Sequence, residues 1–134
     1  MKELNERADV ALLVNTFYSK VREDNILGPV FNTHIKEENW PVHLNRMVDF
    51  WECNLFFRPT FKGNPMQAHL KVDAAYSYQT DERHYRRWVE LWCQTVDLLF
   101  VDEKAQQAKI RAMKMGKQLL AKVMEKKSLF VISS

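Results

Sequence analysis

The chain has 134 residues, and its length predicts a single domain over residues 1–134. Hydrophobic residues make up 46% of the sequence, a globular composition, but no apolar run approaches the roughly 20 residues that a membrane span requires. The formal net charge of +3 reflects 20 Lys and Arg against 17 Asp and Glu, and the excess gathers toward the C-terminus, where a solvated helix face is expected rather than a nucleic-acid site.

Residues 1–7 lack the apolar stretch and the small-residue cleavage site of a signal peptide, so we expect a cytoplasmic protein without a membrane partner. The first helix is predicted over about residues 6–23, with Asn5 as a possible N-cap. Tyr18 lies on its apolar face. Gly28 and Pro29 then predict an interruption, and Phe31 is expected in the connector that follows.

A second helix is predicted to open near Asn39, because Pro41 suits a first helical turn, where a missing N–H is tolerated. Helical spacing relates the residues of its apolar stripe, which are Leu44, Met47, Val48, Trp51, Asn54 and Leu55. His43 lies one turn before Met47 and therefore projects along the edge of this stripe.

Residues 58–64 have a loop composition, and Asn64-Pro65 predicts the start of a short helix that holds Met66, His69 and Leu70. Thr80 is the expected cap of a helix over about residues 81–100. The residues on its expected buried side are Tyr85, Trp88, Leu91, Trp92, Thr95, Leu98 and Leu99.

Asp102 is the expected cap of a last helix that runs to about Lys127. Its apolar stripe comprises Ala105, Ala108, Ala112, Met115, Leu119, Val123 and Met124, and its opposite face is rich in Lys and Arg. Such a face is usually solvated. Since no segment alternates with period two, the sequence predicts an all-α protein with four substantial helices and one short one, a count that a four-helix bundle also fits.

No common catalytic motif occurs: GxSxG, the P-loop, HExxH, CxxC, GxGxxG and Glu-x-x-His are all absent. Cys53 and Cys93 are therefore expected to be reduced core residues. Four polar-tipped side chains on apolar faces remain, namely Tyr18, His43, His69 and Trp88. Residues of these types are more often core side chains with satisfied polar groups than ligands.

Seven short segments of the sequence, taken together, favour a functional role for these four residues over a role as core side chains. The segments are Phe17-Tyr18, Leu27-Gly28-Pro29-Val30-Phe31, Trp40-Pro41-Val42-His43-Leu44, Phe50-Trp51, Lys62-Gly63-Asn64-Pro65, His69-Leu70 and His84-Tyr85-Arg86-Arg87-Trp88. In their order and spacing, the chain resembles the group III truncated haemoglobins over about residues 8–120. This resemblance implies a shortened globin, a two-over-two helical sandwich around one haem b.

The resemblance implies that His69 is the proximal ligand of the haem iron. Its second ring nitrogen would bond either the Asp73 carboxylate or, more commonly, a backbone carbonyl. On the distal side the resemblance implies Tyr18, His43 and Trp88, of which the phenol and the indole can donate hydrogen bonds to a bound ligand. His43 has three possible roles: a gate, a contact to the ligand, or an iron ligand itself.

Apolar haem contacts are also implied, from Phe31, Leu44, Met47, Phe61, Met66 and Leu70 beside His43 and Trp88. Arg46 and Lys62 are candidates for pairing with the propionates. The sequence departs from the family at Phe61, where tyrosine is common, and in the segment 72–79, which is longer than usual.

Two functions follow as hypotheses. The first is a haem protein that binds O2, NO, CO or a similar ligand and retains it strongly, which suits handling of O2, NO or peroxide. An enzymatic redox activity would need a separate reductase, because the chain has no flavin or nicotinamide motif. The second is a non-haem helical interaction module that uses the basic C-terminal helix on an acidic partner.

Overall fold

The computed structural model describes residues 2–57 and 81–133, with residues 126–133 described by their backbone alone. In chain order the elements are α1 (Arg7–Glu23), α2 (Gly28–His34), the 3-10 turn η1 (Glu37–Asn39), α3 (Trp40–Phe56), α5 (Glu82–Leu99) and α6 (Glu103–Ser133). Within these ranges the only extended pairing is an isolated bridge between Lys2 and Phe100. The predicted all-α class is confirmed.

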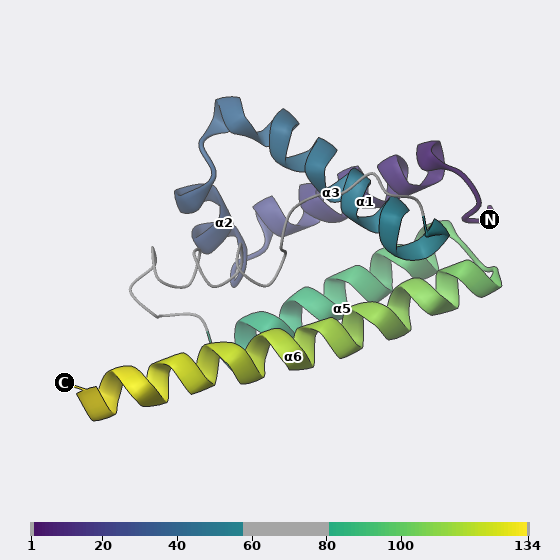
Figure 1. The fold of residues 1–134 in the computed structure, drawn as a ribbon. Coiled ribbons are helices and arrows are strands. Elements are labelled where there is room, and N and C mark those ends of the chain that lie inside the picture. The colour runs from purple at the N-terminus through teal and green to yellow at the C-terminus, as the bar shows by residue number, and fades with distance from the viewer. Residues whose placement is uncertain (1, 58–80, 134) are drawn as a thin grey trace.

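The long helices form two layers of two (Figure 1). Helices α5 and α6 run antiparallel side by side, and α1 and α3 lie across them. The close pairing of α5 with α6 depends on Gly116, since a Cβ atom there would lie 2.7 Å from Cγ2 of Val89. The core between the layers is mainly aromatic and aliphatic, and Trp92 is its largest fully buried side chain.

The start of α1 depends on Asp9 rather than on the predicted cap Asn5. The N-cap is Glu6, and the Asp9 carboxylate accepts hydrogen bonds from the backbone N–H groups of Asn5 and Glu6 at 3.2 and 3.1 Å. The Asp9 side chain is fully buried and pairs with Nζ of Lys2 at 2.7 Å. One carboxylate therefore satisfies the N–H group of the N-cap residue and that of the residue before it.

The predicted interruption occurs, since α1 ends at Glu23 and α2 begins at Gly28, but the connector expected after Pro29 was wrong. Pro29 lies within helix α2, so Val30 and Phe31 are helical rather than part of a connector. Pro29 fits the first turn of α2, because that turn needs no N–H from it. Gly28 is required by a close approach, since a Cβ there would lie 2.8 Å from the carbonyl oxygen of Arg22.

The start of α5 differs slightly from the prediction. Asp81 is its N-cap and accepts a hydrogen bond from the Arg83 N–H at 2.9 Å. The predicted cap, Thr80, lies outside the described residues. Leu98 is 58% exposed, against prediction, because the buried row of α5 runs through Trp88, Trp92 and Val96. Leu98 lies two residues beyond that row, about 200° around the helix.

The cap of α6 is as predicted, since the Asp102 carboxylate accepts a hydrogen bond from the Ala105 N–H at 3.1 Å. The helix continues to Ser133, beyond the predicted end at Lys127. Met124 is 50% exposed rather than buried, since it lies about 100° around the helix from the buried Val123. Among the described residues, no helix is long and apolar enough to cross a membrane.

Candidate functional site

Tyr18, His43 and Trp88, here called the distal cluster, come together from α1, α3 and α5. The ring centroids of Tyr18 and His43 are 5.1 Å apart, with the planes at 85°. The Trp88 side chain lies close enough to the Tyr18 phenol to lower its pKa, against the larger effect of burial. Three residues that lie far apart in the sequence thus lie close together in the fold.

Burial of the phenol sets its protonation state. Tyr18 is 4% exposed and Trp88 is 6% exposed, whereas His43 is half-buried. Burial raises the pKa of Tyr18 well above its ordinary value, and the neighbouring Trp88 side chain only partly opposes this effect. The phenol is therefore protonated throughout the neutral range and can donate a hydrogen bond.

A rigid aromatic shell supports the cluster from the core side. The Phe17 ring makes edge contacts with Tyr18 at 4.8 Å and with Trp88 at 6.0 Å between centroids. Trp92 stacks on Trp88 at 6.4 Å, and Trp51 stacks on Trp92 at 4.3 Å. Because edge and offset contacts between rings are favourable and directional, this shell restricts where the Tyr18 and Trp88 rings can lie.

The structure describes some of the residues that were predicted to form the apolar walls of the haem pocket. Phe31 is buried and its ring lies 6.1 Å from that of Tyr18. Leu44 and Met47 are half-buried against the core, and Arg46, the candidate partner for a propionate, is exposed. The remaining predicted site residues lie outside the described residues: Phe61, Lys62, Met66, His69, Leu70, Asp73 and the segment 72–79.

Trp40 is a site residue that the sequence reasoning missed. Its ring lies 5.4 Å from that of His43 and 6.0 Å from that of Tyr18, and it is 3% exposed. A signal for it was present, because residues three apart on a helix share a face and Trp40 precedes His43 by three. Trp40 therefore forms the outer wall of the distal cluster.

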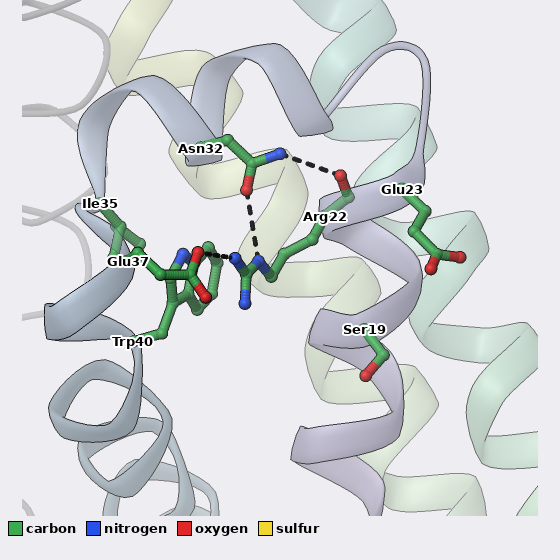
Figure 2. A pocket seen from close by; sticks show the side chains of 7 residues that line it. All are labelled: Ser19, Arg22, Glu23, Asn32, Ile35, Glu37 and Trp40. Carbon is green, nitrogen blue, oxygen red and sulfur yellow. Dashed lines mark hydrogen bonds and ion pairs between the residues drawn. The ribbon is translucent and has the colours of Figure 1, made fainter.

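A polar pocket of about 520 Å³ lies on the other side of Trp40 (Figure 2). Its lining residues are Ser19, Arg22, Glu23, Asn32, Ile35, Glu37 and Trp40. The guanidinium carbon of Arg22 lies 4.6 Å from the centroid of the Trp40 ring, a cation–π arrangement. Trp40 thus separates a polar surface pocket from the buried distal cluster.

The donor set of the cluster indicates the kind of ligand it suits. An indole N–H and a neutral phenol O–H surrounded by rings fit a small ligand that accepts hydrogen bonds. Within residues 2–57 and 81–125, no three His, Cys, Asp or Glu side chains gather as a set of metal ligands. The described side chains thus fit the ligand-facing side of a haem pocket, where the protein supplies donors and apolar walls.

Two comparisons with known proteins agree with the sequence resemblance. The group 3 truncated hemoglobin ctb of Campylobacter jejuni is 27% identical over 103 residues, which cover 75% of this chain and 77% of that protein. The crystal structure of group III truncated hemoglobin from Campylobacter jejuni matches with a TM-score of 0.80 and 24% identity, over 91% of this chain and 94% of that one. No protein-family model matches. The resemblance is confirmed, and the fold is that of a truncated globin.

Proposed function

We propose that this chain, similar to the group III truncated haemoglobins in sequence and fold, binds one haem b and holds a diatomic ligand beside the distal cluster. The observation that carries the proposal is the convergence of Tyr18, His43 and Trp88, with their rings or polar tips in contact inside an apolar shell. A haem would supply the iron that binds such a ligand, and the donors of the distal cluster suit the partial negative charge that the ligand would carry.

Tyr18 and Trp88 are proposed to hold the ligand by donating hydrogen bonds to it. Each bond to a partly charged acceptor contributes about 1.5–3 kcal/mol. Two such donors favour retention over release, which suits O2, NO or peroxide handling better than simple delivery. Phe31, Leu44 and Met47 are proposed to exclude water from the ligand. His43 either contacts the ligand, gates its entry or binds the iron.

The proximal side of the proposal rests on the sequence. We assign His69 as the axial ligand, with Phe61, Met66 and Leu70 as apolar haem contacts and Asp73 or a backbone carbonyl as the partner of the second ring nitrogen. A neutral imidazole would suit this role, because its unprotonated ring nitrogen can bind iron. Any redox turnover would draw electrons from a separate reductase in the cytoplasm.

Absorption spectra of the purified protein in its ferric, ferrous and CO-bound forms test the proposal. We expect an intense Soret band, and we expect His69→Ala to lose most of it. His34→Ala is the matched control, because His34 is exposed at the end of α2 and should leave the band unchanged. A colourless protein that does not respond to added haemin would contradict the haem proposal and would favour the interaction module instead.

A further inference from the structure

We propose that Arg22 is a positioning residue for the distal cluster: by holding the Trp40 indole inward, it keeps the His43 ring against Tyr18 and so limits ligand entry. The consequence for ligands rests on the proposed function, whereas the positioning of the two rings does not. The His43 ring contacts the Trp40 ring, and the Trp40 ring contacts the Arg22 guanidinium on the side nearer the surface.

His43 depends on its neighbours for its place. It is half-buried on α3, and its ring makes near-perpendicular edge contacts with Tyr18 at 5.1 Å and with Trp40 at 5.4 Å. Tyr18 is fixed by the aromatic shell on the core side. Trp40 is therefore the wall whose movement would let the imidazole leave the cluster.

Trp40 stands between this cluster and open space. Its inner side meets Tyr18 and His43, and its ring also lines the polar pocket of about 520 Å³. An indole that turned outward would find room in that pocket. The side chain that lies over the ring on the pocket side is Arg22 (Figure 2).

Arg22 is itself held from two neighbouring elements. Its Nε donates to Oδ1 of Asn32 at 3.4 Å, while Nδ2 of Asn32 donates back to the Arg22 carbonyl oxygen at 2.9 Å. One of its terminal nitrogens forms an ion pair with the Glu37 carboxylate of η1. The guanidinium is thus fixed by α2 and η1 while it covers a ring of α3. Through Arg22, the end of α1 is therefore connected to Trp40, the outer wall of the distal cluster.

Arg22→Met tests the inference, since methionine keeps an apolar stem and removes the charged group. In the haem-loaded protein we expect CO association, measured by flash photolysis, to become about two- to fivefold faster, the factor that an ordinary cation–π contact represents. Arg22→Lys, which keeps a cation, should recover part of the original rate. Glu37→Gln, which loosens Arg22, should act in the same direction with a smaller effect.

Two comparisons separate positioning from a general loss of stability. Arg86→Met is the matched control, because Arg86 forms an exposed ion pair with Glu82 on α5 and should leave the rate unchanged. In a His43→Ala background, Arg22→Met should have no further effect, since the side chain it positions is gone. An unchanged rate in Arg22→Met, or an equal acceleration in both backgrounds, would overturn the inference.

A second readout needs no haem. In the apoprotein, the NMR shifts of the His43 ring protons carry ring-current contributions from Tyr18 and Trp40, and Arg22→Met should move them toward the values of a solvated histidine. Arg86→Met should leave them in place. If the protein bound no haem but these shifts moved as expected, the proposed function would fail and the positioning role would stand. Shifts that stay unchanged in Arg22→Met would refute the positioning role directly.

Discussion

Tyr18 meets side chains from several elements of the fold. Its ring contacts Phe17 on its own helix, Phe31 on α2 and both Trp40 and His43 on α3, and its phenol lies beside the Trp88 side chain of α5. Helical periodicity showed only that Tyr18, His43 and Trp88 each had a polar tip on an apolar face, and it was the resemblance to the group III truncated haemoglobins that implied a shared site. Arg22 was missed because its role depends on a contact between α1 and α3, which helical periodicity does not encode.

Removing either distal donor should speed ligand release. We expect Tyr18→Phe and Trp88→Phe each to increase the O2 dissociation rate by about 10- to 150-fold, the equivalent of a lost hydrogen bond of about 1.5–3 kcal/mol. Stopped-flow replacement of O2 by CO measures these rates. Tyr85→Phe is the control, since Tyr85 packs with Leu119 and Val123 outside the cluster and should leave the rate unchanged. Unchanged rates in both distal variants would refute hydrogen-bond retention.

At the scale of the elements, helix-capping residues and prolines predicted most helix starts. They failed where a helix start depends on packing against another segment of the chain. The starts of α3 and α6 follow from Pro41 and Asp102, whose effects act within one turn. Gly28 and Pro29 carry a signal that either ends or begins a helix. What decides between the two is the packing of Gly28 against the backbone of Arg22, a tertiary contact.

The contact between α5 and α6 gives a test at this scale. Gly116→Leu would place side-chain atoms where Val89 already lies, so we expect the free energy of unfolding to fall by about 1–3 kcal/mol. Urea denaturation followed by circular dichroism measures the change. Adding Val89→Ala should restore part of the loss, and Gln106→Leu, at an exposed position of α6, should have little effect. A Gly116→Leu protein as stable as the wild type would show that the two helices can move apart without penalty.

At the scale of the whole molecule, buried or half-buried carboxylates join segments that lie far apart in the sequence. The Asp24 carboxylate accepts hydrogen bonds from the Ile26 and Leu27 N–H groups at 3.0 Å and from Nε of Arg87 at 2.8 Å. It thereby connects the end of α1, the start of α2 and helix α5 beside Trp88. Helical periodicity predicted the four long helices, but pairs 63 residues apart such as Asp24 and Arg87 leave no periodic signal.

This junction should make stability depend on acid pH. Burial alone would raise the pKa of Asp24, but the hydrogen bonds from Leu27, Arg87 and Ile26 outweigh it and lower the pKa below the usual 3.8. A carboxyl whose pKa is lower in the folded state stabilises the fold above its unfolded pKa, and this contribution is lost as the pH falls toward the folded value. The unfolding free energy should therefore decrease as the pH drops below about 4.

Asp24→Asn isolates the contribution of this carboxylate. We expect it to lower the unfolding free energy at pH 7 by about 1–3 kcal/mol, because Arg87 loses its charged partner in a site where the Asp24 side chain is 7% exposed. Its acid dependence should be shallower than that of the wild type, so the two proteins should converge at low pH. Asp97→Asn breaks an exposed ion pair with Lys109 and should change stability by less than about 1 kcal/mol. Urea titrations between pH 3 and pH 7 give the slope of the unfolding free energy against pH for each protein. Equal slopes for the wild type and Asp24→Asn would contradict the role of Asp24. The acid sensitivity would then come from Asp9 or Asp81, whose pKa values are also lowered.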